Sequence, residues 1–180
     1  KRDFLRPDDE RSGVGLIKTH VPIGAANAYL IEILDDASTV QQVGHSARLE
    51  IPFHSSELAI SGVIKKNKKS QVGADFSSAI WDLDVNFEFA YSDGSDRIFY
   101  RPSNILVTGM PFETYRKDSS IYALSTGISY DLKYLDSDLM TFAIEYFRNG
   151  EGYTDVNDSI WVVANGAYEP YYLGRDYGMF

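Results

Sequence analysis

The sequence contains no cysteine and only two tryptophans among its 180 residues. Without cysteine the chain has no disulfide framework and no thiolate for catalysis or metal binding. It also lacks any apolar run that approaches the ~18–20 residues of a transmembrane helix. These absences exclude a disulfide-stapled domain, whereas cytosol, periplasm and outer membrane all remain compatible with the composition.

Basic residues are scarce relative to acidic ones. Lysine and arginine total 17 against 26 aspartates and glutamates, so the formal net charge is −9. Such a balance argues against nucleic acid and against an anionic membrane surface as partners. We therefore expect no nucleic-acid partner.

Helical periodicity is weak, and alternation of apolar and polar residues dominates the sequence. The stretch 83–89, "LDVNFEF", places an apolar side chain at every second position and a carboxylate or amide between them. Aromatic residues reach 14%, which favours strands. The pattern predicts about eight strands of about 8–11 residues. The expected segments are 13–21 (ended by Pro22), 27–34, 44–53, 57–65, 71–80, 81–91, 121–131 and 139–147.

The connections between these segments alternate between long and short. Long ones are expected at 1–12, 35–44, 92–119 and 148–177, and 65–70 is of medium length. Short ones fall at 22–25, 54–56, around Trp81 and at 132–138. A transmembrane barrel has tight turns on one side of the membrane and extended loops on the other, whereas a soluble sandwich has no reason for this asymmetry.

The alternate positions of the strands that carry polar residues are rich in small residues and carboxylates, as expected for the wall of a water-filled lumen. We expect eight residues of this parity to line a pore: Arg48, Glu50, Asp75, Asp84, Asn86, Glu88, Asp131 and Glu145. Aromatics near the strand ends fit interfacial girdles. These are Trp81, Tyr91, Tyr122, Tyr130, Tyr134, Tyr146 and Phe147. Carboxylates in excess over cations predict a pore that prefers cations.

The fold class indicated by these features is all-β, an antiparallel transmembrane β-barrel in a Gram-negative outer membrane. Its expected function is passive passage of small hydrophilic, preferentially cationic solutes, without catalysis. One alternative is a soluble β-barrel or sandwich that buries the apolar face around an apolar ligand. A second alternative is an outer-membrane lipid-modifying enzyme, which would need a serine or carboxylate constellation.

Three phrases resemble uncharacterised Gram-negative outer-membrane porin-like proteins, related in style to alginate-export barrels. They are "DFLRPDDERSGV" (3–14), "VGADFSS…WDLDVNFEFAYSDGSDR" (72–97) and "EYFRNGEGY…YEPYYLGRDY" (145–177). The resemblance implies passage of hydrophilic solutes across the outer membrane and names no substrate. Proteins of this kind are typically roughly twice as long as this chain.

Residues 1–180 are expected to form a single barrel domain or a segment of a larger barrel. Both ends of the chain fall in predicted outer loops, so further strands or other chains are expected to complete the wall. Residues 177–180 are expected to enter another strand. The long loops 92–119 and 148–177 are expected to act as constriction, plug or partner surfaces.

No metal or cofactor is expected from the spacing of possible ligands. His20, His45 and His54 lie near predicted strand ends or turns and lack the spacing of a metal site. The acidic run 155–158, "DVND", does not match an EF-hand loop and is expected to be a hydrated acidic loop.

Overall fold

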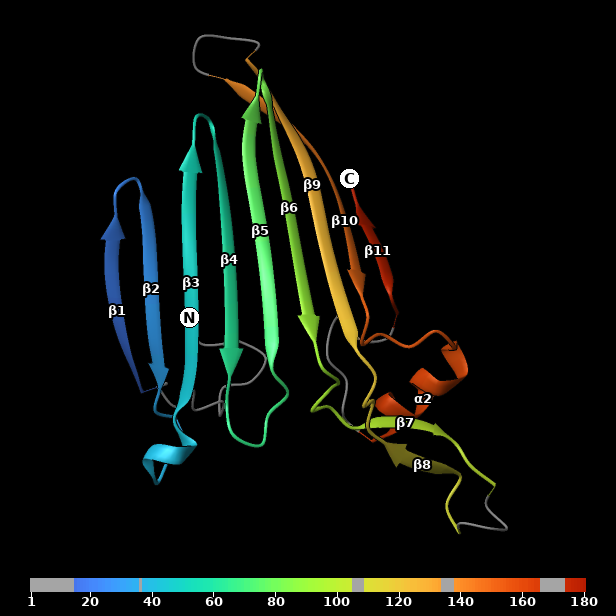
Figure 1. The fold of residues 1–180 in the computed structure, drawn as a ribbon. Coiled ribbons are helices and arrows are strands. Elements are labelled where there is room, and N and C mark those ends of the chain that lie inside the picture. Colours follow the sequence, from blue (N-terminus) through green and yellow to red (C-terminus); the bar gives the residue numbers. More distant parts are fainter. Residues whose placement is uncertain (1–14, 36, 105–108, 134–137, 166–173) are drawn as a thin grey trace.

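The computed structural model describes residues 15–35, 37–104, 109–133, 138–165 and 174–180. Its main element is one antiparallel sheet of nine strands, in the order β1-β2-β3-β4-β5-β6-β9-β10-β11 (Figure 1). The strands are β1 (Leu16–Ile23), β2 (Ala26–Ile33), β3 (Gly44–Phe53), β4 (Ser56–Ile64), β5 (Gln71–Ile80), β6 (Leu83–Ser92), β9 (Ile121–Lys133), β10 (Leu139–Asn149) and β11 (Asp176–Met179). A short 3-10 helix, η1 (Val40–Gln42), precedes β3.

The all-β class and all eight predicted strands are confirmed, and so is a ninth strand near residue 177. β11 pairs with β10 over residues 145–148. Pro22 does not end the first strand as predicted; it lies inside β1, where it opposes Asn27. β1 is an edge strand of the described sheet, and an edge tolerates a residue without a backbone N–H.

The connections divide the sheet into a turn end and a loop end (Figure 1). At the turn end, two-residue connections join β1 to β2, β3 to β4 and β5 to β6. The first residue of each has a positive φ: Gly24 at 63°, His54 at 55° and Trp81 at 57°. Residues 34–43, 65–70, 93–120 and 150–175 make the longer connections at the loop end. The predicted alternation of short and long connections is therefore confirmed from β1 to β9, whereas the predicted connections at 1–12 and 132–138 fall wholly or mainly outside the described residues.

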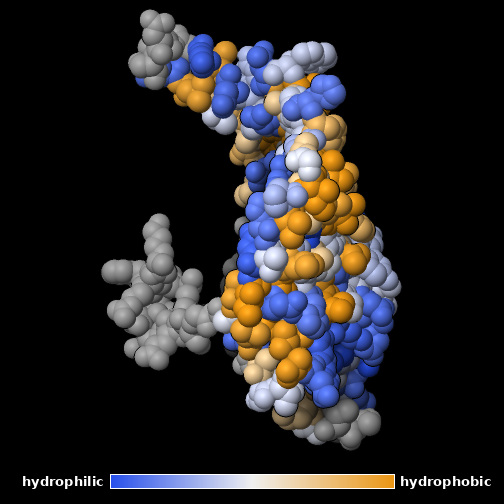
Figure 2. All heavy atoms as spheres, turned by 60° about the vertical axis from the view of Figure 1, so that its left-hand side comes forward, coloured by the Kyte–Doolittle hydropathy of each residue, from blue (hydrophilic) through white to orange (hydrophobic). Residues whose placement is uncertain are grey.

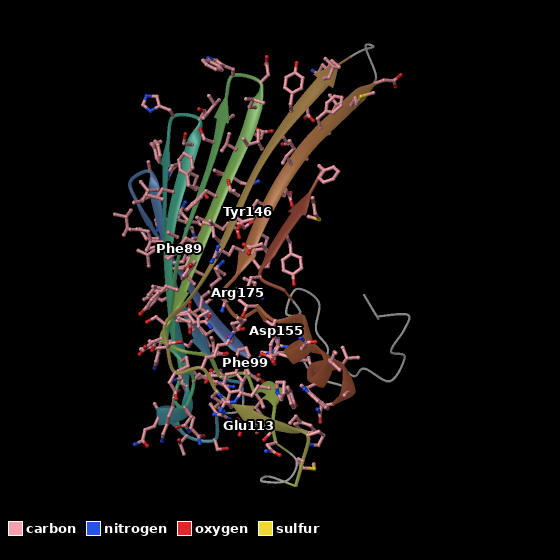
Figure 3. All side chains as sticks on the ribbon, turned by 90° about the vertical axis from the view of Figure 1, so that its right-hand side faces the viewer. Phe89, Phe99, Glu113, Tyr146, Asp155 and Arg175 are labelled. Atoms are coloured by element: carbon pink, nitrogen blue, oxygen red, sulfur yellow. The ribbon has the colours of Figure 1, made fainter. Side chains whose placement is uncertain are left out.

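The two longest connections are not plain loops, because they contain a separate small unit. It consists of β7 (Phe99–Pro102), β8 (Phe112–Tyr115) and α2 (Val156–Ala164), and we call it the loop-end unit. Phe99, Tyr153 and Val162 form its core. The Tyr100 backbone N–H donates to the Tyr153 hydroxyl at 2.9 Å, and burial raises the pKa of that phenol. This unit lies beyond the loop end of the sheet (Figure 3).

The sheet itself is a single layer. Its strand register defines a polar face, which carries Arg48, Asp75 and Glu88, and an apolar face, which carries Ile60, Phe87 and Ile128. Within the described residues, extensive contacts between elements join neighbouring strands or members of the loop-end unit. Hydrophobic side chains therefore lie open at the surface of the sheet (Figure 2).

The described sheet does not close on itself, since β1 and β11 form its two edges. β11 covers only the loop-end part of β10, and residues 139–144 of β10 have no partner strand on that side within the described chain. In the part of the chain that is described, no helix is long and apolar enough to cross a membrane.

Candidate functional site: the polar face of the sheet

All eight predicted pore-lining residues lie on the polar face. The register opposes Glu50 to Ala59, Ala59 to Asp75 and Asp75 to Glu88, so these side chains share one face. Arg48 lies on β3 two residues before Glu50 and so shares its face. The pairing of β6, β9 and β10 adds the remaining members of the set: Asp84, Asn86, Asp131 and Glu145. The alternation along each single strand thus correctly predicted that these residues share one face across six strands. That this face lines a pore stays a prediction.

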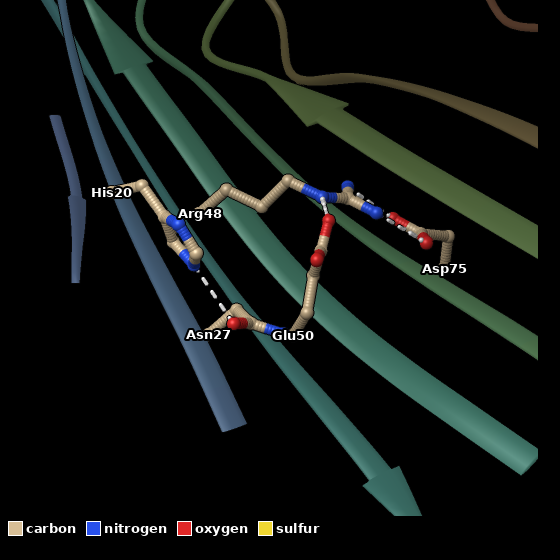
Figure 4. Close-up of polar contacts among 5 residues, drawn as sticks. All are labelled: His20, Asn27, Arg48, Glu50 and Asp75. Atoms are coloured by element: carbon tan, nitrogen blue, oxygen red, sulfur yellow. Dashed lines mark hydrogen bonds and ion pairs between the residues drawn. The ribbon is translucent and has the colours of Figure 1, made fainter. Parts of the chain in front are cut away.

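Arg48 is the centre of the best-formed polar cluster on this face (Figure 4). Its Nη1 and Nη2 donate to the two carboxylate oxygens of Asp75 at 2.7 and 2.9 Å, and its Nε donates to Glu50 at 2.8 Å. Arg48 lies on β3 and Asp75 on β5, so the guanidinium crosses the intervening strand β4. Ala59 of β4 lies in this row and is fully buried. A small residue at that position leaves room for the bidentate pair.

A second cluster on the polar face was missed by the sequence reasoning. His20 Nε2 lies 2.8 Å from the Asn27 side-chain oxygen, and its ring stacks on Tyr29 with centroids 4.8 Å apart. Lys18 Nζ lies 4.3 Å from the centre of the same tyrosine ring. The signal that could have found this cluster is the pairing of 20 with 29 across the two-residue turn at 24–25. His20 was expected near a strand end or a turn, and it lies within β1.

Other polar-face carboxylates have no cation beside them. Asp84, Glu88 and Glu145 make no ion pair within the described residues, and Asp131 accepts a hydrogen bond from Thr141 at 2.6 Å. Asn86 lies across Gly127, where a Cβ would come within 2.9 Å of the amide oxygen. The strand carboxylates on this face number seven against three cations. The acids are Glu50, Glu57, Asp75, Asp84, Glu88, Asp131 and Glu145, and the cations are Lys18, Arg48 and Lys133.

The polar face is hollowed where its side chains are smallest. A row of small residues crosses β4, β5, β6 and β9: Ser61, Gly73, Ala90 and Ala123. They line a depression of about 510 Å³ together with Arg48, Asp75, Glu88 and Phe147. Phe147 was predicted to join an interfacial girdle, and this is wrong: it opposes Ser125 on the polar face and packs beside Tyr177.

On the apolar face of the described strands, ionisable side chains other than tyrosine occur only near the loop end. They form two pairs, Glu32 with His45 and Arg148 with Asp176, the latter at 3.6 Å. The tyrosines of this rim are Tyr91, Tyr122 and Tyr146. Trp81 and Tyr130 lie toward the turn end, and Tyr134 is outside the described residues. An uncharged band therefore runs between a charged, tyrosine-rich rim and the turns.

The apolar face also carries a groove of about 590 Å³ beside β11. Its lining includes Ile128, Tyr130, Phe142, Ile144 and Phe180. Phe180 is fully exposed. The groove lies along the part of β10 that β11 leaves without a partner.

The remaining motifs singled out in the sequence have structural roles. The prediction of a hydrated acidic loop at 155–158 is wrong, because α2 begins at Val156. Asp155, the first residue of the "DVND" run, is the N-cap of this helix, and its carboxylate accepts from the Asn157 backbone N–H at 2.8 Å. His45 pairs with Glu32, and His54 is the left-handed residue of a tight turn. No group of three or more possible metal ligands gathers within the described residues.

Comparison with protein-family models, with curated proteins and with solved structures finds no match to this chain.

Proposed function

We propose that the sheet is part of a transmembrane β-barrel in an outer membrane. Its polar face lines a water-filled passage for small hydrophilic solutes, with a preference for cations. The apolar face contacts lipid. Further strands, from the same or from other chains, complete the wall beyond β1 and β11.

The observation that carries the proposal is the band of exposed hydrophobic side chains between the charged rim and the turns. Ile60, Phe142 and Ile144 are 52%, 54% and 68% exposed, although they lie within strands. Soluble proteins rarely leave so wide an apolar patch in water. Six strands of the sheet, β3, β4, β5, β6, β9 and β10, have 9–13 residues and are long enough to cross the hydrocarbon layer when tilted. An outward apolar band flanked by aromatics is typical of such barrels.

The charge of the opposite face supports the preference for cations. The strands carry seven carboxylates and three cations on that face. One of the carboxylates, Asp75, is neutralised by its bidentate pair with Arg48. The carboxylates without a cation, Asp84, Glu88 and Glu145, set a negative potential along the wall. Lining charge of one sign raises the local concentration of counter-ions.

The experiment is a measurement of reversal potential in planar bilayers under a salt gradient. The double variant Asp84→Asn/Glu88→Gln removes two unpaired carboxylates from the wall, and we expect the cation preference to fall. The matched control is Glu32→Gln/Glu113→Gln, which also removes two carboxylates. Glu32 lies on the apolar face and Glu113 in the loop-end unit, where it pairs with Arg101. The control is expected to change the reversal potential less than the Asp84/Glu88 variant does, because neither carboxylate lies on the polar face of the sheet.

Equal reversal potentials for the parent and the Asp84/Glu88 variant would remove these residues from a pore wall. Failure to observe any conductance from a chain that inserts into vesicles would contradict the channel itself. The assay thus separates insertion from conduction.

The groove beside β11 favours one alternative, a protein that binds an apolar ligand in water. That alternative requires the apolar face to be covered when the protein is folded. A chain that stays folded and monomeric in buffer without detergent would support it and contradict the membrane proposal.

A further inference from the structure

A small cleft lies where the loop-end unit joins the sheet, and three cations line it. Lys117 precedes β9, Arg148 lies near the end of β10, and Arg175 precedes β11. Arg175 sits between the loop end of the sheet and α2 (Figure 3). The cleft has a volume of about 130 Å³. A cluster of three cations is unexpected in a chain whose formal net charge is −9.

Two of these cations, Lys117 and Arg175, donate hydrogen bonds to neutral backbone carbonyl groups. Lys117 Nζ donates to the Glu151 backbone carbonyl at 3.4 Å and lies 4.1 Å from the centre of the Phe99 ring. Arg175 Nε donates to the Gly152 carbonyl at 3.2 Å. Within the described residues neither has an ion pair at salt-bridge distance, whereas Arg148 has Asp176 at 3.6 Å.

Glu151 is the carboxylate that acts electrostatically on Lys117, and a hydroxyl group holds its position. Glu151 accepts a hydrogen bond from the hydroxyl of Ser95, which is itself buried. Burial lowers the pKa of Lys117, and the positive charge of Arg175 lowers it further, with Glu151 opposing the effect. An anion in the cleft would relieve this repulsion.

The other groups lining the cleft suit an oxyanion. Ser119 and Ser120 contribute hydroxyls, and Ser120 Oγ lies 2.9 Å from the Tyr91 hydroxyl. Arginine guanidinium groups bind phosphate oxygens in bidentate fashion, and a lysine ammonium adds a point charge. Arg148 and Tyr122 belong both to this cleft and to the rim of the apolar face.

We propose that the cleft formed by Lys117, Arg148 and Arg175 binds a phosphate group. Two sources carry this chemistry: free phosphate, and the headgroup of a membrane lipid. The position of the cleft beside the rim of the apolar face favours the lipid source. Only that lipid arm rests on the proposed function, because phosphate binding itself requires no membrane.

The test is isothermal titration calorimetry on the full chain in an uncharged detergent at constant ionic strength. Sodium phosphate and a short-chain phosphatidic acid are the two ligands, and sodium chloride is the reference salt. The variant Lys117→Gln/Arg175→Gln is expected to weaken phosphate binding about tenfold or more, equivalent to ~1.4 kcal/mol. The control Lys66→Gln/Lys68→Gln removes the same charge from the β4–β5 connection at the same end of the sheet, and it is expected to change the affinity less than about twofold.

The charge-retaining variant Lys117→Arg/Arg175→Lys is expected to keep phosphate binding. It therefore distinguishes loss of charge from misfolding caused by substitution at these two positions. Tighter binding of phosphatidic acid than of free phosphate identifies the lipid headgroup as the ligand, and equal binding identifies free phosphate. Absence of phosphate binding in the parent, or equal losses in the glutamine variant and its control, overturns the proposal. Phosphate binding that persists in a chain without conductance would contradict the channel and not this cleft.

Discussion

The nine-stranded sheet and the loop-end unit differ in where their apolar side chains lie. In the loop-end unit Phe99 and Val162 are 0% and 1% exposed, although the unit is built from two four-residue strands and one short helix. In the sheet, which is far larger, the buried hydrophobic residues are Ala59 and Ile121. The smaller part of the molecule therefore has a dry core, whereas the larger part, as described, has none.

This difference indicates two sources of stability. The loop-end unit follows the rule for water-soluble folds, in which burial of apolar area drives packing. The sheet satisfies its backbone by strand pairing and leaves its apolar side chains to whatever medium surrounds them. If that medium is hydrocarbon, the absence of a core costs nothing, because strand pairing is the requirement of a membrane interior.

The largest effect is expected from removal of the Phe99 ring. Phe99→Ala should lower the local stability of the loop-end unit by about 3–5 kcal/mol, because the ring is fully buried against Tyr115 and Tyr153. Hydrogen exchange of the backbone amides of β7, β8 and α2 measures this loss. The control Ile160→Ala alters a half-exposed residue of α2 and should change the local stability of the loop-end unit by less than about 0.5 kcal/mol.

The outcome for the sheet in the same Phe99→Ala protein is equally informative. Strand amides of β3 to β6 should keep their protection, because the cluster around the ring is built from Tyr100, Tyr115, Tyr153 and Val162, all outside those strands. Loss of protection throughout the sheet would mean that the two regions share one core, and the comparison would fail.

A charge on the apolar face tests the medium of the sheet. Ile128→Arg places a guanidinium in the middle of β9, where Ile128 is 50% exposed and opposes Val85 and Ile144. In lipid vesicles this should cost about 2–4 kcal/mol, measured by denaturant unfolding. The neighbouring change Ser129→Arg puts the same charge on the polar face beside Asp84 and should cost far less.

Equal costs for Ile128→Arg and Ser129→Arg would contradict a lipid-facing apolar side. A larger cost for Ser129→Arg would reverse the assignment of the two faces, as in a soluble barrel. The pair of variants thus tests the orientation of the sheet without any assay of transport.

The strands were predictable because their signal is local. Alternation over 8–13 residues assigns both the strand and the face of each side chain, and it placed residues as distant as Arg48 and Glu145 on one side. The Arg48–Asp75 pair was not predictable in the same way. It depends on the register of three strands and on the small size of Ala59 between them.

The loop-end unit was missed because its elements are short. β7 and β8 have four residues each, too few for a period of two to be distinguished from chance. α2 contains three valines and an isoleucine within nine residues, a composition with modest helix propensity. One usable signal was present: Asp155 directly before the helix, in the position of an N-cap.

The smallest effect is expected at that N-cap, and it tests whether α2 depends on its own end or on the core. Asp155→Ala removes the carboxylate that accepts from the Asn157 backbone N–H and should cost about 1 kcal/mol. Asp158→Ala, in the first turn of the same helix, loses only a favourable interaction with the helix dipole, and it should cost about 0.3–1 kcal/mol. Amide exchange within α2 measures both. Asp155→Ala could instead remove amide protection from the loop-end unit as completely as Phe99→Ala does. The unit would then depend on the end of α2 and not on burial of the Phe99 ring, and its description as a water-soluble core would be wrong.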